Sequence, residues 1–476
     1  MSLPTSWHAD WSHLKAVVLG LARSGFSAVD TLVELGVETV AIGASAKPEI
    51  IEMTEVIGSR FIPGEDPALL GELGFRPDFA VVSPGFSPSH PLVQSLAGEG
   101  IPLITDIDLA WRLRDKVKVA GWLAITGTNG KTTTCELVSH ILNGSGRRAV
   151  ACGNIGSPIL DAIRDPVGFD YLVVELSSFQ LHYLGEIHPV ASAFLNFAED
   201  HVDWHGSLED YFAAKAKIFL GTEKAIIFNE QDDKTLEAAK AADVIEGCRA
   251  IGFSLFTPQP SSIGFVEDIL VDRAFLDNRK DQALEIVTEA EIGEIASVSD
   301  QLKANVAAAT ALTRAVAVSP AEIKHALSSF QISPHRNQLV AVSAGVSFVN
   351  DSKATNPHAA NSSLISYESV VWIMGGDFKG TDPRELIQTH AKRLKAVVVI
   401  GKTSDQTARL VTELLPGAQV TVISGDDVMS QAVRAATSLA TAGDTVLLAP
   451  AAASIDQFKD YAERGDKFIA AVRELK

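Results

Sequence analysis

Cysteine is scarce in this chain, which has three in 476 residues: Cys135, Cys152 and Cys248. They stand far apart and lack the paired spacing of zinc or redox sites. An odd and sparse set also excludes a small scaffold held together by disulfides. We therefore expect reduced thiols and a cytoplasmic location.

Positive charge is also in deficit. Forty lysines and arginines stand against 59 acidic residues, which gives a formal net charge of −19. This balance argues against nucleic acid or an anionic membrane as a partner, because both attract basic surfaces. A small anionic ligand is still possible, since it needs only a local pocket of N–H groups and a few basic side chains.

Long apolar runs are missing too. No stretch approaches the roughly 20 residues of a membrane span, and the first twenty residues carry charges where a signal peptide needs an apolar core. Hydrophobic residues nevertheless make up 46% of the chain, which is enough for about three domain cores. We expect a soluble, monomeric protein.

Short apolar runs alternate with helical segments in the first and last parts of the chain, a rhythm typical of parallel sheets. In the last part these runs lie at 346–351, 370–377, 396–401, 419–424 and 444–450. The fold class is therefore α/β. We expect a Rossmann-like domain over 1–113, a central domain over 114–332 and a second Rossmann-like domain over 333–476.

A glycine loop opens the central domain. The segment "TGTNGKTT" (126–133) follows an apolar run and precedes the helical pattern "CELVSHIL". Such a turn directs backbone N–H groups and the positive end of a helix dipole at an anion. Lys131 and Thr132 suit a phosphate and its Mg²⁺, which predicts a P-loop for ATP. Ile125 replaces the first glycine of the common loop, so a chance glycine turn is the alternative.

A second glycine turn, Gly20-Leu21-Ala22-Arg23-Ser24-Gly25, lies near the N-terminus. It resembles a dinucleotide fingerprint with Ala22 in place of the middle glycine. The next strand ends in Gly43-Ala44-Ser45, without the acid that holds a ribose diol. We do not expect a complete dinucleotide site; a phosphate-holding helix N-terminus and a structural turn both stay open.

Two features of the central domain could serve metal chemistry. Glu175 ends the run "YLVVE", where a carboxylate beside a phosphate loop can hold Mg²⁺; the alternative is an acid facing solvent. The segment 196–206, "NFAEDHVDWHG", could bind a metal or form a polar loop, and its spacing does not decide between them.

Lys215 falls on an apolar stripe with Leu208, Tyr211 and Phe219, in a helix that we expect to begin with a Ser207–Asp210 capping box. A lysine there must reach solvent, find a partner or lose its charge. Reaching solvent is the simpler interpretation. A neutral lysine could instead take up CO₂ and become a carbamate.

Together these segments resemble the Mur ligases, in order and spacing, through all three predicted domains. The matching stretches are "TGTNGKTT", "GNIG" (153–156), "VVELSSFQL" (173–181), "NFAEDHVDWHG", "YFAAKAKIF" (211–219), "SPHR" (333–336), "NDSKATNP" (350–357), "GGDFK" (375–379) and "PAAASIDQF" (450–458). The resemblance implies ATP-dependent amide formation through an acyl phosphate, in cytoplasmic peptidoglycan precursor synthesis. "DSKATN" and "SPHR" imply D-glutamate as the added amino acid and UDP-N-acetylmuramoyl-L-alanine as its acceptor.

The same resemblance implies roles for individual residues around ATP. Those expected to hold the nucleotide are Gly127, Thr128, Asn129, Gly130, Lys131, Thr132 and Thr133, with Asn305, Arg336, Asp351 and Lys353 closing on it. Two Mg²⁺ ions, replaceable by Mn²⁺, are expected at Thr132, Glu175, His201 and Lys215, with Lys215 as the carbamate. The catalytic residues would be Lys131, His201 and Lys215.

Substrate contacts are also implied. UDP would be held by Arg23, Ser24, Ser83, Pro84 and Gly85, the muramyl part by Asn154, Ser177 and Gln180, and D-glutamate by His335, Thr355, Lys379, Ser454 and Tyr461. Three positions depart from the family pattern: Gly43-Ala44-Ser45 at the uracil side, Gln301-Leu302 before the alanine-rich helix, and Tyr461 where phenylalanine is common.

Two other functions remain open on the sequence. A related ligase could use another amino acid or acceptor, which the altered uracil side would favour. A nucleotide-controlled switch would need neither Lys215 nor His201. For the ligase, we expect the domains to close during reaction, because the predicted ATP and D-glutamate contacts lie in different parts of the chain.

Overall fold

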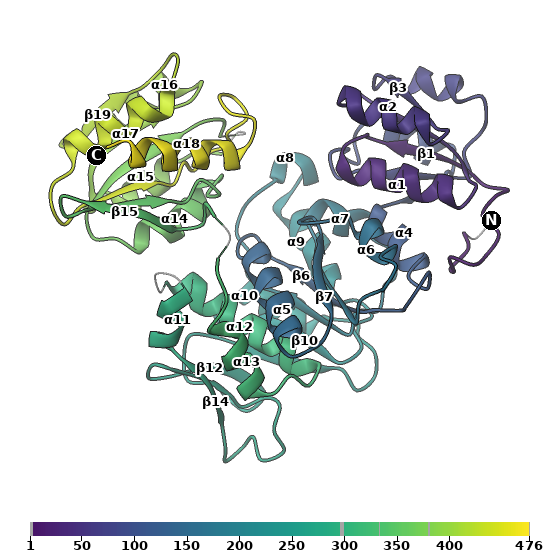
Figure 1. Cartoon of the computed structure of the whole chain (residues 1–476), viewed down its shortest axis with the longest axis horizontal. Coiled ribbons are helices and arrows are strands. Elements are labelled where there is room, and N and C mark those ends of the chain that lie inside the picture. The colour runs from purple at the N-terminus through teal and green to yellow at the C-terminus, as the bar shows by residue number, and fades with distance from the viewer. Residues whose placement is uncertain (1–2, 296–298, 333, 379–380, 476) are drawn as a thin grey trace. The chain divides into compact units, whose positions relative to one another are not determined.

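The computed structural model describes residues 3–295, 299–332, 334–378 and 381–475. It has three sheets rich in parallel strands (Figure 1), which confirms the expected α/β class. The chain forms two compact units, residues 1–292 with 302–330, and residues 293–301 with 331–476. The domain boundaries expected after residues 113 and 332 stay predictions.

The first sheet has five parallel strands in the order β3-β2-β1-β4-β5. Its strands are β1 Lys15–Leu19, β2 Glu38–Gly43, β3 Arg60–Pro63, β4 Phe79–Val82 and β5 Leu103–Ile104. Its helices are α1 Arg23–Glu34, α2 Pro48–Val56, η1 Pro67–Leu73, α3 Pro91–Gly98 and α4 Asp106–Arg112. Alternate residues of β1 pack into two separate cores, Val18 into one and Val17 into the other, so both faces are covered. The strand order reverses between β1 and β4, and ligands of open α/β sheets bind at such a point.

The second sheet has nine strands in the order β14-β13-β12-β11-β10-β9-β6-β8-β7. Its strands are β6 Gly121–Thr126, β7 Ala149–Gly153, β8 Tyr171–Glu175, β9 Ala191–Phe194, β10 Ala225–Asn229, β11 Arg249–Phe253, β12 Ser262–Val266, β13 Ile269–Asp272 and β14 Leu284–Thr288. The part from β7 to β12 is parallel, and β13 and β14 extend it in antiparallel pairing. The glycine loop after β6 therefore lies between the carboxyl ends of β8 and β9.

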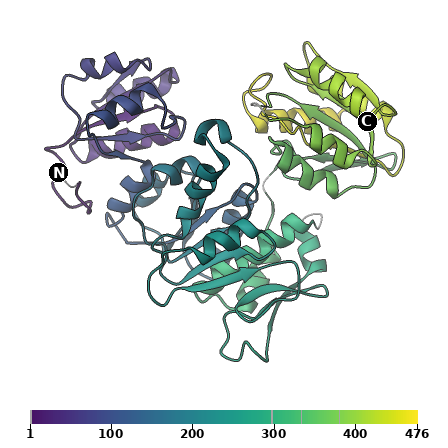
Figure 2. The same ribbon diagram turned by 180° about the vertical axis from the view of Figure 1, so that it is seen from behind.

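Helices of the central region pack around this sheet (Figure 2). They are α5 Lys131–Gly144, α6 Ile159–Ile163, α7 Ser178–Tyr183, α8 Val202–His205, α9 Leu208–Ala216, η2 Lys217–Phe219, α10 Asp233–Lys240, α11 Glu289–Ile295, α12 Asp300–Ala315 and α13 Pro320–Leu327. The alanine-rich helix is α12, and ten of its residues, from Leu302 to Thr313, are buried.

The third sheet has the order β15-β16-β20-β17-β18-β19. Its strands are β15 Gln338–Ser343, β16 Val346–Asn350, β17 Val370–Gly375, β18 Leu394–Ile400, β19 Gln419–Val422 and β20 Thr445–Leu448. Its helices are α14 Pro357–Ile365, α15 Arg384–His390, α16 Ser404–Leu414, α17 Val428–Leu439 and α18 Tyr461–Arg473. All five predicted apolar runs are strands, β16 to β20, whereas the antiparallel edge strand β15 was not predicted.

The cysteines lie inside the first unit. Cys135 and Cys152 are buried, Cys248 is partly buried, and all three are free thiols. Burial raises the pKa of each thiol above its ordinary value. Among the described residues, no helix combines the length and the apolarity that crossing a bilayer requires.

Candidate active site

The glycine loop joins β6 to α5. Gly130 takes the left-handed conformation at the N-cap, with φ 80°, which glycine adopts without strain. The Lys131 ammonium folds back over the loop and donates to the carbonyl oxygens of Gly127, at 2.8 Å, and Thr128, at 3.0 Å. The Lys131 ammonium thus lies beside the start of α5. Backbone N–H groups and the positive end of the helix dipole favour a phosphate at such a position.

Asn196 fixes the shape of this loop from the end of the neighbouring strand β9. Its Oδ1 accepts from the N–H of Asn129 at 2.8 Å, and its Nδ2 donates back to the carbonyl of Asn129 at 3.1 Å. Its own carbonyl accepts from the N–H of Thr128 at 3.0 Å. The sequence pattern predicted only that Asn196 belongs to a metal-binding or polar segment. In the structure its bonds fix the conformation of the glycine loop.

Glu175 bonds to Thr132, its expected partner at the first Mg²⁺, and to Asn154, which is expected at the muramyl part of the substrate. The Glu175 side chain is buried, 2% exposed, so the interpretation as an acid facing solvent was wrong. One carboxylate oxygen accepts from the Thr132 hydroxyl at 2.8 Å and the other from the Asn154 amide at 2.9 Å. Three residues from three separate segments thus meet at the carboxyl edge of the sheet.

The Glu175 carboxylate and the Thr132 hydroxyl are oxygen donors of the kind that Mg²⁺ binds. The described residues contain no group of three or more His, Cys, Asp or Glu side chains that could hold a metal alone. Mg²⁺ typically takes one or two protein oxygens and completes its shell with water and phosphate. A carboxylate and a hydroxyl beside a phosphate loop are sufficient for that arrangement.

Lys215 points into the site from α9, whose N-cap is Ser207 as predicted: its Oγ accepts from the N–H of Asp210 at 3.0 Å and donates to the Asp210 carboxylate at 2.7 Å, in place of the backbone bond that would complete a capping box. Lys215 is 2% exposed, and its Nζ donates to the Gly127 carbonyl at 2.8 Å while lying 5.0 Å from the centre of the Tyr211 ring. Burial, reinforced by the charge of Lys131, lowers the pKa of Lys215 well below its ordinary value. The interpretation that this lysine reaches solvent was wrong.

His201 and His205 play different parts. His201 has a left-handed backbone, with φ 52°, and its partly exposed ring lies 4.7 Å from the ring of Phe179, centre to centre. His205 has its Nε2 3.0 Å from Ser178 Oγ, and burial lowers its pKa to about 4. Both histidine rings lie beside Tyr211, as Lys215 does: His205 at 5.3 Å and His201 at 6.3 Å between ring centres. His205 is more deeply packed, against α7, whereas His201 is partly exposed.

Ser177 and Gln180 form the capping box of α7. Ser177 Oγ accepts from the N–H of Gln180 at 3.2 Å, and Gln180 Oε1 accepts from the N–H of Ser177 at 3.0 Å. They lie directly after Glu175, which places them near Asn154. Their contacts to a muramyl group stay predictions.

At the first sheet, the residues expected to hold UDP follow β1 and β4, the two strands beside the reversal of strand order. A Cβ on Gly25 would lie 2.0 Å from the carbonyl oxygen of Gly20, so the turn packs against the helix start with no room for a side chain. Arg23 donates to the carbonyl of Gly156 at 2.9 Å. Arg23 and Ser24 thus follow one strand, and Ser83, Pro84 and Gly85 the other.

In the second unit, the expected D-glutamate residues surround the ends of β16 and β20. The His335 ring lies 6.4 Å from the Tyr461 ring, centre to centre, and Lys353, which is expected at ATP, has its ammonium 3.8 Å from the centre of the same Tyr461 ring. Thr355 donates its N–H to the Lys353 carbonyl at 2.8 Å, and Ser454 is buried two residues after Ala452. Lys379 lies outside the described residues.

Two profiles of known families match the chain: the Mur ligase middle domain over residues 125–312 and the Mur ligase glutamate ligase domain over residues 335–452. UDP-N-acetylmuramoylalanine--D-glutamate ligase of Leifsonia xyli subsp. xyli is 49% identical, over 99% of this chain and 94% of that protein. The enzyme of that name from Tropheryma whipplei (strain Twist) is 44% identical, over 99% and 98%. This chain belongs to the Mur ligase family.

The resemblance inferred from the motifs is therefore confirmed, and the protein is a ligase. Its fold also matches the crystal structure of UDP-N-acetylmuramate-alanine ligase from Thermotoga maritima. The TM-score is 0.58 at 15% identity, and the match covers 98% of this chain and 100% of that one. At that identity the match concerns the fold alone.

The residues expected to close on ATP are divided between the two units of this Mur ligase. Asn305 is buried on α12 of the first unit, whereas Arg336, Asp351 and Lys353 belong to the second. Asp351 is also buried; its carboxylate accepts from the N–H of Asn337, at 3.1 Å, and from the Ser363 hydroxyl. It therefore fastens the loop that carries Arg336, and burial raises its pKa.

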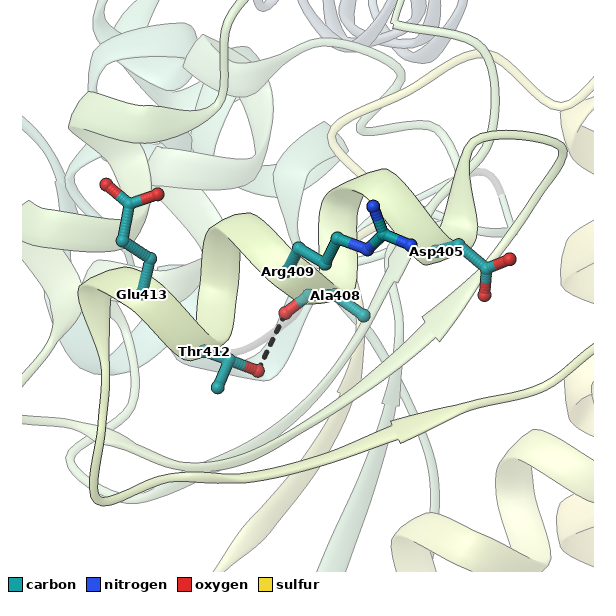
Figure 3. Close-up of a pocket in the computed structure, with 5 residues that line it drawn as sticks. All are labelled: Asp405, Ala408, Arg409, Thr412 and Glu413. Carbon is teal, nitrogen blue, oxygen red and sulfur yellow. Dashed lines mark hydrogen bonds between the residues drawn. The ribbon is translucent and has the colours of Figure 1, made fainter.

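A hollow of about 670 Å³ lies along α16 of the second unit (Figure 3). It is lined by Asp405, Ala408, Arg409, Thr412 and Glu413. Thr412 Oγ1 donates to the Ala408 carbonyl at 2.8 Å, and the charged side chains stand on the exposed face of the helix. None of these residues was expected in the site, and we do not assign this hollow to the ligase's active site.

Proposed function

We propose that this Mur ligase joins D-glutamate to the alanyl carboxyl group of UDP-N-acetylmuramoyl-L-alanine, with ATP converted to ADP and phosphate. The observation that carries the ATP chemistry is the convergence of Lys131, Thr132 and Glu175 at one strand edge. The choice of substrates is supported by the relatives of that name, which align over nearly the whole chain. The product is a peptidoglycan precursor made in the cytoplasm by a monomeric enzyme.

In this proposal each sheet has one task. Residues 1–113 form a Rossmann-like domain for UDP, which the strand order 3-2-1-4-5 and its reversal beside β1 support. Residues 114–332 form the P-loop domain for ATP. Residues 333–476 form a Rossmann-like domain that binds D-glutamate.

Members of the Mur ligase family use ATP and Mg²⁺. In this chain, Thr132 and Glu175 would hold one Mg²⁺ and His201 and Lys215 a second; Mn²⁺ could replace either. When bound, the metals neutralise phosphate charge as two anions approach each other. The chain's own part is positional. Lys131 turns from the Gly127 and Thr128 carbonyls to the β- and γ-phosphates, and residues 127–133 surround the triphosphate, with the N–H groups at the start of α5 directed at it.

The covalent steps then occur on the substrates. An oxygen of the alanyl carboxylate attacks the γ-phosphorus, ADP leaves, and an acyl phosphate forms. The amine of D-glutamate attacks the acyl carbon, phosphate leaves with the bonding electrons of the C–O bond, and the nitrogen loses its extra proton. His335, Thr355, Lys379, Ser454 and Tyr461 hold D-glutamate, while Asn305, Arg336, Asp351 and Lys353 close on ATP.

Lys215 acts as a carbamate in this proposal. Its neutral Nζ adds to CO₂ and loses one proton, which leaves an anion facing the loop. Two observations support this step: the side chain is 2% exposed, and in the described part of the chain its Nζ donates only to the neutral oxygens of Gly127 and Thr126. A buried ammonium with such partners is costly, whereas a neutral amine is not.

Phosphate release tests the proposed reaction. The assay contains ATP, Mg²⁺, UDP-N-acetylmuramoyl-L-alanine and D-glutamate, and each component is omitted in turn. We expect release only with all four present, and none when L-glutamate replaces D-glutamate. Release without D-glutamate, or equal release with L-glutamate, would overturn the assignment.

A further inference from the structure

Arg464 is a fully buried charged residue on α18 of the second unit, with an exposed fraction of 0%. Its three hydrogen bonds all end on neutral oxygens. Nε donates to Ser352 Oγ at 3.0 Å, Nη2 to the Ser352 carbonyl at 2.8 Å, and Nη1 to the Ala452 carbonyl at 3.1 Å. Within the described residues, no carboxylate lies at ion-pair distance from this guanidinium.

These bonds tie together the two loops that carry the expected amino-acid pocket. Ser352 follows β16 and lies three residues before Thr355, while Ala452 follows β20 and lies two residues before Ser454. The two strands are parallel neighbours, so both loops leave the same sheet edge. Ser352 Oγ also donates to the Tyr461 carbonyl at 2.7 Å, which joins the start of α18 to the same network.

The charge of Arg464 is poorly compensated. Burial lowers its pKa to about 10, so the guanidinium keeps its charge at neutral pH. The acidic group that acts on it most is Asp456, whose Oδ2 accepts from the N–H of Lys402 at 2.8 Å. A buried cation that is hydrogen-bonded only to neutral oxygens is stabilised when an anion arrives nearby.

We propose that Arg464 is a positioning residue that fixes the Ser352 and Ala452 loops and makes the pocket between them selective for an amino acid with a side-chain carboxylate. This inference rests on the proposed function, because it takes D-glutamate as the occupant. The three bonds hold the loops in shape, and the unpaired charge under them favours D-glutamate over its neutral amide, D-glutamine. Arg464 does not touch the ligand, since it is enclosed by the chain.

The test compares R464M, R464K and the control R473M in the full-length enzyme. Arg473 is an exposed residue at the end of the same helix. For R464M we expect the KM for D-glutamate to rise roughly tenfold, as losing hydrogen bonds to a charged group implies. The KM for UDP-N-acetylmuramoyl-L-alanine, whose proposed contacts lie in the first unit, should stay within about twofold of its wild-type value. R464K keeps the positive charge but loses the planar guanidinium that makes the three bonds. Its KM for D-glutamate should therefore lie between those of R464M and the wild type.

Selectivity separates an electrostatic effect from general damage. The inhibition constant of D-glutamine, competing with D-glutamate, should change less in R464M than the KM for D-glutamate does. If both rise by the same factor, if only kcat falls, or if the KM for UDP-N-acetylmuramoyl-L-alanine rises equally, the proposal is wrong. If R464M fails to fold, R464K carries the same comparison.

These results also separate the inference from the proposed function. A wild-type enzyme that does not use D-glutamate refutes the function. A wild-type enzyme that uses D-glutamate, with R464M and R464K unchanged in KM, refutes only the role of Arg464.

Discussion

Lys215 Nζ and Lys131 Nζ donate to the same carbonyl oxygen, that of Gly127, each at 2.8 Å. One lysine reaches this oxygen from the helix that follows the loop, and the other from the core side of α9. Two cations at one carbonyl would repel each other. Burial, and after it the charge of Lys131, lowers the pKa of Lys215. The arrangement is relieved if Lys131 moves to a phosphate and Lys215 gains a negative charge.

Replacing Lys215 should therefore stop the reaction without removing the nucleotide site. For Lys215→Ala we expect kcat to fall by at least about 100-fold, with the Kd for ATP nearly unchanged, as measured by titration calorimetry. Bicarbonate cannot rescue this variant through the missing amine, but acetate should restore part of the turnover by supplying the carboxylate.

Lys217→Ala is the matched control for that variant. Lys217 is exposed, and it donates to the His182 carbonyl away from the loop. It should keep near wild-type turnover. Normal turnover in Lys215→Ala would contradict the carbamate.

Glu175→Gln should uncouple nucleotide binding from magnesium. The amide keeps the shape of the side chain but loses the charge that faces Thr132 and Asn154. We expect Mg²⁺ to strengthen ATP binding in the wild type and to do so much less in this variant, measured by calorimetry with and without the metal. Glu186→Gln, at a side chain 75% exposed, should behave as wild type. An unchanged magnesium effect in Glu175→Gln would remove this residue from the metal site.

Gly25→Ala should destabilise the first sheet. The new methyl group would lie 2.0 Å from the Gly20 carbonyl oxygen, so the turn or the helix must shift. Overpacking of this kind costs about 1–3 kcal/mol, and it should also weaken UDP binding. Gly98→Ala on α3, where nothing lies within 4 Å, should change stability by less than about 1 kcal/mol. Urea unfolding midpoints measure the stability of both variants. Equal midpoints would show that the Gly20 turn can shift to accommodate the methyl group without a loss of stability.

Asp106 should make stability depend on pH. It is 4% exposed, and burial raises its pKa from 3.8 to about 6, against a smaller opposite effect of the Gln180 side chain. The folded state thus binds a proton that the unfolded state has released between about pH 4 and 6, so stability falls as the pH rises through this window.

Asp106→Asn removes that ionisation. We expect the variant to gain about 3 kcal/mol over the wild type at pH 7.5 and only about 1 kcal/mol at pH 4.5. Urea unfolding at the two pH values measures the difference, with Asp405→Asn on the exposed face of α16 as the control. The same gain at both pH values would mean that Asp106 is not the titrating group.

Elements with both faces buried could be predicted from the sequence. All six residues of β17, Val370–Gly375, are buried, and a continuous apolar run indicates such a strand. The edge strand β15 gives no such signal, because its side chains are half-buried or exposed. The antiparallel extension by β13 and β14 was likewise not predicted, since these short strands lack the crossover helices of the parallel part.

Those parts of the candidate site that consist of one continuous sequence segment could be predicted. The glycine loop and the position of Lys215 on an apolar stripe are local patterns. The Asn196–Asn129 bonds join residues 67 apart, and the Arg464–Ser352 bonds join residues 112 apart. Such contacts depend on which strands become neighbours, β9 with β6 and β16 with β20, and composition and spacing do not encode that order.

The three thiols of this enzyme, two of them buried, allow dyes to be attached at chosen positions in its two units. Because Cys135 and Cys152 are buried and the pKa of every thiol is raised, the native protein should react slowly with maleimides at neutral pH. Cysteines introduced at Val56 in the first unit and Val342 in the second, which are 81% and 62% exposed, would then label selectively. Energy transfer between two dyes at these positions would report the separation of the units as each substrate is added, in an otherwise unaltered chain.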